Sequence, residues 1–377
     1  MQTKKMFYAA ISLFIHFCIL CGYGVPGFLL PTYLLQRSSR ISYSLYDDQE
    51  TAITQRGAYE ESIMKPSIPL QPNKPRGSGS SGGFGGRSSK GSKTSALKEQ
   101  AKAHAQVLRQ VGVVRIDDVL SKTLADELRE FVYMLRDTAK TEVAEQKVER
   151  RHRFADVLLR RNRCDLTMPL TELTYRALHA LLCESPVGAT LQNLLGDDAV
   201  LYEFSCLISE PGSDRQVIHP DTPIFGDDNE IPVLYTCFVS LQDMTQDMGP
   251  TCWMPDTHTK EAHESFQIEI PSDGNTVSPK DQLLKTKDSV LGVLPKGCCG
   301  IFDSRLLHAG TANRSDQPRA IFYVSFKNPK LGYPGNPASI RPDLSGKLNL
   351  RQLQKELKSI HQGKGSIALD ALASKQV

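Results

Sequence analysis

The 377-residue chain has little of the features that mark specialised classes of protein. It has one tryptophan, its aromatic content is 7%, and its formal net charge is only +3. A charge this small gives no reason to expect nucleic acid as a partner of the whole molecule. Of the nine cysteines, Cys18 and Cys21 lie in the N-terminal apolar segment. The other seven, an odd number, lie beyond residue 100 without CxxC spacing, so we expect no disulfide framework. With 40% hydrophobic and 23% charged residues, the composition is that of a soluble, monomeric globular protein.

The chain has one long hydrophobic run, at its N-terminus, where Lys4 and Lys5 precede the apolar stretch Phe7–Leu20. This pattern predicts that residues 1–36 are a signal peptide, or a membrane anchor that associates with the bilayer through residues 6–24. Either would send the chain into the secretory pathway, to the endoplasmic reticulum or, through the serine- and arginine-rich segment that follows, to a plastid bounded by extra membranes.

Residues 37–95 are predicted to be a transit-like and disordered linker. Their last part, residues 74–96, is rich in glycine and serine and buries too little apolar area to fold. Arg76 and Arg87 among these glycines leave open an RNA-binding tether of the RGG type, although a single interleaved aromatic, Phe84, favours a spacer.

The folded domain is predicted to span residues 96–377, with helices first and strands after them. Helices are expected at Ala96–Val111 and Leu170–Leu182. Another helix is expected to begin after the capping residue Ser121, with apolar residues at helical spacing: Leu124, Leu128, Phe131, Met134 and Leu135. Strand patterns follow at Val113–Ile116, Val200–Ser209, Val217–His219, Val233–Leu241, Gly300–Phe302 and Ala320–Phe326. This order predicts an α+β fold with a double-stranded β-helix (jelly-roll) core, and a final helix, Leu348–Ile360, packed outside the sheet.

A charged stretch interrupts the helical part of this domain. Arginines recur between Arg150 and Arg163, with Glu149 and Asp156 nearby. We interpret the stretch as the solvated face of a helix; a contact with a substrate carboxylate or phosphate is the alternative.

Two short motifs carry the chemistry. In His219-Pro220-Asp221, Pro220 and Pro223 favour extended backbone, in which residues i and i+2 project to the same side. The second motif runs from His308 through a turn at Asn313–Pro318 to Arg319, which opens the next strand. Two histidines and one carboxylate from separate segments form the ligand set of a mononuclear non-haem Fe(II) site. Arg319 is then placed to bind the distal carboxylate of 2-oxoglutarate, because its planar guanidinium pairs bidentately with carboxylates.

With these motifs the chain resembles the phytanoyl-CoA dioxygenase family over roughly residues 105–345. Gln216-Val-Ile-His219-Pro-Asp221 is similar to the family's Gln-x-x-His-x-Asp, Gly249-Pro250-Thr251 to a stretch after a core strand, and His308-x-Gly310-x-x-Asn313-x-Ser315-x-x-x-Arg319 to its distal motif. The family's usual Pro-Gly-Ser-His is here Pro255-Asp256-Thr257-His258. The resemblance implies the iron ligands His219, Asp221 and His308, and contacts to 2-oxoglutarate from Arg319, Gln216 and Thr251.

The resemblance also implies the type of reaction. An Fe(II)- and 2-oxoglutarate-dependent dioxygenase consumes O2, releases succinate and CO2, and in some cases needs ascorbate as a reductant. Related halogenases carry a small residue in place of the metal-binding carboxylate, so Asp221 favours a halide-free oxidation. Hydroxylation, desaturation and cyclisation of a small secondary metabolite or a lipid-like molecule all stay open. So do an inactive relative that serves as a binding module and a cupin-type metalloenzyme without 2-oxoglutarate.

Four further residues near these motifs are interpreted without a catalytic role. Asn313 and Ser315 are expected to stabilise the turn by hydrogen bonds to the local backbone. His258 and His263 are expected to be surface histidines and not a second metal site, because no carboxylate or cysteine has a suitable spacing.

Overall fold

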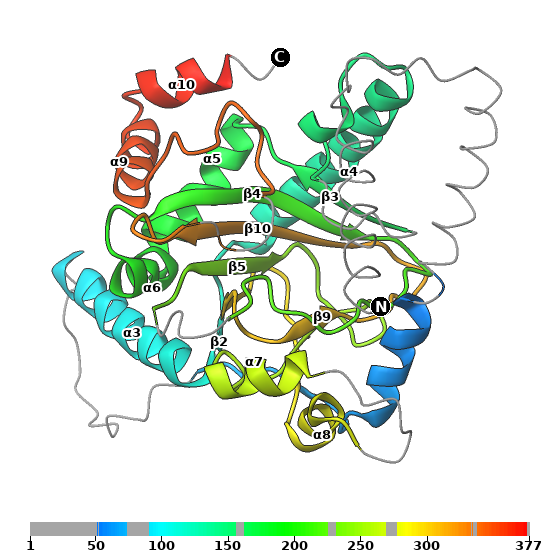
Figure 1. Ribbon diagram of the computed structural model, residues 1–377. Helices are drawn as coiled ribbons and strands as arrows, with labels where there is room; N and C mark the ends of the chain where they lie inside the picture. The colour runs from blue at the N-terminus through cyan, green and yellow to red at the C-terminus, as the bar shows by residue number, and fades with distance from the viewer. Residues whose placement is uncertain are drawn as a thin grey trace, which may run out of the picture. The chain divides into compact units, whose positions relative to one another are not determined.

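Strands β4 (Val200–Ser209) and β10 (Arg319–Lys327) form the centre of the larger sheet. The structure is a computed structural model that describes residues 51, 53–73, 90–155, 162–224, 231–268, 277–332, 334 and 338–374. The two strands pair antiparallel from Arg319, opposite Ser209, to Lys327, opposite Val200. Figure 1 shows them side by side with β5 (Leu234–Ser240), the other neighbour of β10.

Two sheets make up the core. The larger has the order β2-β8-β5-β10-β4-β3, with all of its pairings antiparallel, and the smaller has the order β1-β7-β6-β9. The remaining strands are β1 (Ile68–Pro69), β2 (Val113–Ile116), β3 (Arg163–Thr167), β6 (Thr251–Trp253), β7 (Val290–Leu291), β8 (Cys299–Asp303) and β9 (His308–Gly310). The predicted α+β fold with a jelly-roll core is confirmed, while Val217–His219 forms only an isolated bridge and no strand.

Alternation along the strands divides the larger sheet into two faces. On the outer face, Cys206, Cys237 and Phe322 pack against helices in one hydrophobic cluster. On the inner face, Phe238 and Tyr323 pack with Trp253 of the smaller sheet in a second cluster. The inner face also carries polar residues, and it is there that the candidate site forms.

The helices begin where capping residues satisfy their first N–H groups. Ser121 accepts a hydrogen bond from the Leu124 N–H at the start of α4, as predicted, and Thr171 accepts one from Thr174 at the start of α5. The helices are α3 (Lys90–Val111), α4 (Lys122–Ala144), α5 (Glu172–His179), α6 (Pro186–Leu195), α7 (Lys260–Gln267), α8 (Pro279–Thr286), α9 (Leu350–His361) and α10 (Ile367–Ala373). The predicted final helix is confirmed as α9, whose Leu353 and Leu357 join the outer cluster.

Two details of the predicted helices are wrong. Met134 is 60% exposed, because the buried stripe of α4 follows Leu124, Leu128 and Val132, at every fourth residue, and leaves Met134 outside it. The segment predicted as one helix over residues 170–182 is α5 followed by a π-helical turn, Ala180–Glu184.

The predicted linker over residues 37–95 is wrong for residues 53–73. Residues 53–63 form a helix, and β1 pairs in parallel with β7 inside the unit Ile53–Val377. Glu60 explains why this segment is ordered: its carboxylate is 2.8 Å from the Lys280 Nζ and accepts a 2.7 Å hydrogen bond from the Ile218 N–H, and all of these groups are buried. Helix α3 also begins at Lys90, within the predicted glycine/serine spacer.

The predicted signal or anchor over residues 1–36 and the spacer over residues 74–89 lie outside the described residues. Within the described part of the chain, no helix has the length and apolar character that a membrane span requires.

Candidate active site

His219 and His308 face each other across an antiparallel β-bridge. The N–H of each residue donates to the carbonyl oxygen of the other, at 2.9 Å in both directions. Their rings lie with centroids 4.6 Å apart. The sequence places these histidines 89 residues apart, and the bridge brings their imidazoles into one site.

Each imidazole is held in one orientation by the backbone carbonyl of the residue two positions earlier. The Nδ1 of His219 is 2.8 Å from the Val217 oxygen, and the Nδ1 of His308 is 2.8 Å from the Leu306 oxygen. A carbonyl oxygen only accepts hydrogen bonds, so each Nδ1 carries the proton and donates it. In the neutral imidazole, Nε2 then keeps its lone pair, which is the state that a metal ligand requires.

Asp221 completes a group of three possible ligands. Its Oδ1 lies 3.9 Å from the His219 Nε2 and 3.6 Å from the His308 Nε2, and the three ligand atoms are all within 4.8 Å of one another. The next residue, Thr222, is fixed by a 2.9 Å hydrogen bond from its N–H to the Ser304 oxygen. His219 and Asp221 therefore project to the same side, as the i, i+2 spacing predicted.

Arg319 lies at the start of β10, on the inner face, and lines the same cavity as the three ligands. Its side chain is 2% exposed, its Nη1 donates to the Gly249 oxygen, and its Nε has no hydrogen-bond partner among the described residues. Burial lowers the pKa of Arg319 to about 10, which still leaves it cationic at neutral pH. No carboxylate of the described residues forms an ion pair with this buried cation, so it is suited to an anionic ligand.

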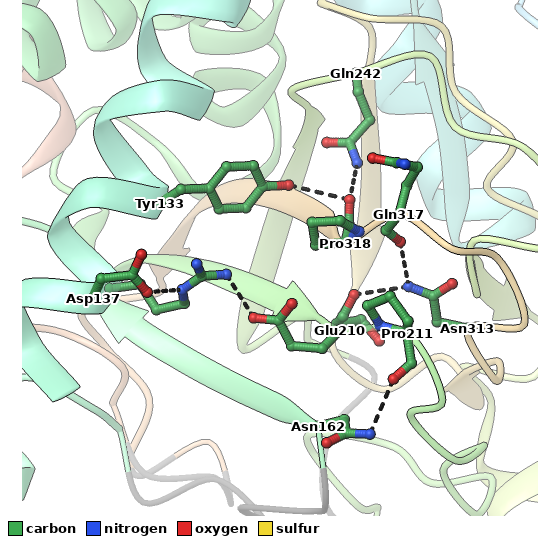
Figure 2. A network of polar contacts seen from close by, with 11 residues as sticks. Tyr133, Asp137, Asn162, Glu210, Pro211, Gln242, Asn313, Gln317 and Pro318 are labelled. Atoms are coloured by element: carbon green, nitrogen blue, oxygen red, sulfur yellow. Dashed lines mark hydrogen bonds and ion pairs between the residues drawn. The ribbon is translucent and has the colours of Figure 1, made fainter.

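The turn that precedes Arg319 is fixed by side chains from two other parts of the chain and by its own Asn313 and Ser315 (Figure 2). Tyr133 of α4 and Gln242 both donate to the Pro318 oxygen, at 3.1 Å and 2.8 Å. The Asn313 amide donates to the Ser209 and Gln317 oxygens, at 2.9 Å each. Ser315 in turn donates to the Asn313 side-chain oxygen at 2.7 Å, so both residues stabilise the turn as predicted.

Gln216 and Thr251 approach the cavity from the two sides of β9. The Gln216 Oε1 accepts a 2.8 Å hydrogen bond from the Gly310 N–H, and Thr251 pairs with Gly310 in the smaller sheet. A Cβ on Gly310 would lie 2.6 Å from the Gln216 Oε1, which explains the glycine at this position. The cavity is partly open to solvent and is lined by all six predicted residues: Gln216, His219, Asp221, Thr251, His308 and Arg319.

Two buried acids in this cavity were missed by sequence reasoning. Asp165 of β3 is 2% exposed and Glu203 of β4 is 4% exposed, and both line the cavity together with Tyr323 and Thr236. One sequence signal could have found them. A carboxylate at an inward-facing position of an otherwise apolar strand, such as Glu203 within Val200–Ser209, is unusual.

The predicted surface positions of His258 and His263 are wrong, because both histidines are buried. The His263 Nδ1 accepts a 3.0 Å hydrogen bond from the Ile224 N–H, and its Nε2 donates to the Arg305 oxygen at 2.7 Å. Its two backbone contacts give His263 a structural role. Neither histidine lines the cavity.

A different group of described residues, His179, Glu184 and His361, also brings possible ligand atoms within 4.8 Å of one another. It lies where the π-helical turn meets the end of α9, and its two imidazoles stack with centroids 4.1 Å apart. None of the three residues lines the cavity.

The interpretation of Arg150–Arg163 as a solvated helix face is wrong for Arg153 and Arg163. Arg150–His152 form an exposed 3-10 turn, but Arg153 pairs with Glu142 at 2.6 Å and is largely buried. Arg163 belongs to β3, where its guanidinium donates to the Asp214 and Thr311 oxygens and lines the cavity. Residues 156–161 lie outside the described part of the chain.

The residues present fit the two groups that the motifs imply. Two imidazoles with available Nε2 atoms and one carboxylate, on one side of a cavity, suit Fe(II) and leave positions open for other ligands. The buried Arg319, with its partnerless Nε, suits the distal carboxylate of 2-oxoglutarate.

Comparisons with known proteins give the family. Similar solved structures include AviO1 from Streptomyces viridochromogenes (14% identity, TM-score 0.43, 62% of this chain and 97% of that chain). They also include the non-heme alpha-ketoglutarate-dependent carbocyclase SnoK from nogalamycin biosynthesis (18% identity, TM-score 0.43, 62% and 87%). The epimerase SnoN from the same biosynthesis is another (17% identity, TM-score 0.40, 64% and 93%). Among curated proteins, none matches this sequence significantly.

The model of the phytanoyl-CoA dioxygenase family matches residues 108–321, more than half of the chain. This range contains both motifs and every residue that the resemblance assigned to the site. The chain belongs to the phytanoyl-CoA dioxygenase family of iron- and 2-oxoglutarate-dependent oxygenases.

Proposed function

We propose that this protein oxidises an unactivated C–H bond of a small organic or lipid-like metabolite, with His219, Asp221 and His308 as its iron ligands. The observation that carries the proposal is the convergence of three segments on one cavity. The first segment contributes Gln216, His219 and Asp221, the second His308 and Gly310, and the third Arg319, although nearly ninety residues separate the first segment from the second. The bridge between His219 and His308 fixes this geometry through backbone hydrogen bonds.

The remaining predicted residues are assigned to 2-oxoglutarate. Arg319 binds the distal carboxylate, because it is a buried cation on the inner face whose Nε has no hydrogen-bond partner among the described residues. Gln216 and Thr251 line the cavity on either side of Gly310 and position the cosubstrate between Arg319 and the ligand group. The fixed turn before Arg319 keeps the guanidinium in place without reorganisation when the anion binds.

When bound, iron supplies the oxidising chemistry, with 2-oxoglutarate and O2 as cosubstrates and ascorbate as a supporting reductant. The chain's own residues bind the metal and the cosubstrate, orient the ligand side chains and shield the site from water. The carbonyls of Val217 and Leu306 hold the Nδ1 protons and so keep each imidazole neutral and directed at the metal position. Phe238 and Tyr323 line the inner wall and limit the access of water to the site. Such a site supports hydroxylation, desaturation and cyclisation as possible reactions.

Succinate formation tests the proposal. Purified protein with Fe(II), 2-oxoglutarate and O2 is expected to release succinate even without substrate, at a slow uncoupled rate. The rate should vanish on chelation of iron and in the His308→Ala variant. If wild-type protein binds iron and 2-oxoglutarate but never forms succinate, with candidate substrates or without, the chain is a binding module and the proposed activity is wrong.

We further propose that residues 1–36 direct the chain into the secretory pathway, on the basis of Lys4, Lys5 and the apolar stretch after them. Residues 1–36 or 1–95 fused to a fluorescent reporter are expected to enter the endoplasmic reticulum or a plastid. A reporter that stays in the cytosol in both fusions contradicts this targeting.

A further inference from the structure

The inner face of the larger sheet has two chemically different ends. Arg319 lies opposite Ser209 at one end of the β4–β10 pair, and Ser325 lies opposite Glu203 towards the other. Asp165 approaches from the neighbouring strand β3, where it lies opposite Leu207. The cavity is therefore basic where we place the cosubstrate and acidic away from it.

Asp165 is the most informative residue of the acidic end. Its Oδ2 accepts hydrogen bonds from the Tyr323 hydroxyl at 2.7 Å and the Ser339 hydroxyl at 2.6 Å. Its Oδ1 is buried and has no hydrogen-bond partner among the described residues. An acceptor left unpaired in a protein interior is costly and rare, so its presence beside a cavity indicates a donor that comes from a ligand.

No lysine or arginine of the described residues is among the groups that shift the pKa of Asp165. The groups that stabilise its carboxylate are the hydroxyls of Ser339, Tyr323 and Ser205, and burial raises the pKa of Asp165 to about 6. Glu203, which accepts a 2.5 Å hydrogen bond from Ser325, also has a raised pKa, first because of burial and then because of the nearby Asp221.

From this arrangement we infer that the cavity beside Asp165 is a substrate subsite for a protonated amine, with the Asp165 Oδ1 as its acceptor. An ammonium group supplies the hydrogen-bond donor that the unpaired Asp165 oxygen lacks. It also carries a positive charge, which two buried carboxyl groups favour. An unsubstituted acyl chain supplies neither and would leave these polar atoms desolvated. The inference rests on the proposed function and narrows its substrate class to amine-bearing metabolites.

The test uses three small probes with one carbon skeleton: cyclohexylamine, cyclohexanol and cyclohexanecarboxylate. Their dissociation constants are measured by ligand-observed NMR on the full chain, with Fe(II) and 2-oxoglutarate under anaerobic conditions. Wild-type protein is expected to bind the amine at least 10-fold more tightly than the alcohol, and the carboxylate most weakly. Equal binding of amine and alcohol overturns the inference without the need for any variant.

One variant and a matched control assign the preference to the subsite. Asp165→Asn keeps the shape of the side chain and is expected to abolish the preference for the amine. The matched control is Asp137→Asn, the same substitution at an exposed carboxylate of α4, which should leave the preference unchanged. A preference for the amine that survives in folded Asp165→Asn contradicts the assignment.

Succinate formation separates this inference from the proposed function. If the protein forms succinate but does not distinguish the amine from the alcohol, the oxygenase assignment stands and the subsite is wrong. If the amine preference is present and depends on Asp165 while no condition yields succinate, the subsite stands and the proposed activity is wrong.

Discussion

His219 and His308 exchange two backbone hydrogen bonds of 2.9 Å, and each also holds the Nδ1 proton of its ring on a carbonyl two residues earlier. The same short stretch of backbone thus sets both the distance between the imidazoles and their tautomer. Because this geometry depends on the backbone and not on the side chains, the histidines can be replaced without unfolding the site.

His219→Ala, Asp221→Ala and His308→Ala are each expected to abolish iron binding at one equivalent per chain, with a loss of melting temperature of only a few degrees. All three side chains line the cavity, so their removal leaves no void in the packed core. The measurements are metal content after dialysis and a thermal melt.

His263→Gln is the matched control for the ligand variants. This buried histidine bonds two backbone groups away from the cavity, so its loss is expected to reduce stability by about 1–3 kcal/mol and to leave iron binding intact. If it is His263→Gln that loses iron while His308→Ala retains it, the ligand assignment is wrong.

Arg319→Ala is expected to raise the dissociation constant for 2-oxoglutarate and to spare that for iron. Removal of one partner of a buried charge pair costs about 2–5 kcal/mol, which corresponds to a loss of roughly 30-fold to several thousand-fold in affinity. Arg319→Lys keeps the charge but loses the planar guanidinium, so its dissociation constant for 2-oxoglutarate should lie between those of the wild type and Arg319→Ala. The folded pKa of Arg319 is lowered to about 10, so binding of 2-oxoglutarate should weaken as the pH rises through that value. A calorimetric titration that shows unchanged affinity in Arg319→Ala excludes this residue from the cosubstrate site.

Gly310→Ala is expected to weaken 2-oxoglutarate binding more than iron binding. The new Cβ would lie 2.6 Å from the Gln216 Oε1 and 2.7 Å from the Arg163 Nη1, so both side chains must move within the cavity. Both are the ends of long side chains, and the loss of stability should therefore be modest, about 1–3 kcal/mol. Gly332→Ala, where no atom lies within 4 Å of the added Cβ, is the matched control. Equal 2-oxoglutarate affinities in the two variants would contradict the role of Gln216.

Residues 53–73 are expected to be necessary for a stable site. Glu60 accepts the Ile218 N–H next to His219 and pairs with the buried Lys280, and loss of one member of such a pair costs about 3–5 kcal/mol. A protein of residues 53–377 should melt well above one of residues 96–377 and bind iron more tightly, and Glu60→Gln should reproduce much of the difference. Glu61→Gln, one residue away and paired only with the exposed Arg314, should have little effect. Equal melting temperatures for the two fragments would restore a domain boundary at residue 96.

Asp165→Asn is expected to flatten the pH dependence of stability. The folded pKa of Asp165 is raised to about 6, so between about pH 4 and 6 the folded state holds a proton that the unfolded state has released. The wild-type protein therefore loses on the order of 2–3 kcal/mol of unfolding free energy as the pH rises through this window. The variant lacks this loss, and relative to the wild type it should be more stable at pH 7 than at pH 4. Chemical denaturation at pH 4 and pH 7 measures the free energy of unfolding of both proteins. If the difference between the variant and the wild type is the same at both pH values, Asp165 does not titrate in this range.

Local sequence signals were sufficient for most secondary structure and for the predicted site. The strands Val113–Ile116 and Val200–Ser209 were predicted at their exact bounds, because alternation of apolar residues directly reports a half-buried strand. The ligand motifs were identified because i, i+2 spacing and a turn before Arg319 are local properties. The family match over residues 108–321 confirms the predicted resemblance to this family, which covered roughly residues 105–345.

Tertiary structure alone decided which distant residues join the site. Asp165 meets Tyr323 and Ser339 across 158 and 174 positions, and Glu60 meets Ile218 across 158. Nothing in the local pattern around Asp165 or Glu60 specifies the register of those pairings, which follows from how β3, β4 and β10 align and where the segment of residues 53–73 docks. The sequence determined the type of chemistry, because motif spacing fixes which side chains share a direction. The folded chain decided the burial and charge of the cavity, because the free energy of a buried carboxyl group depends on neighbours that only long-range packing supplies.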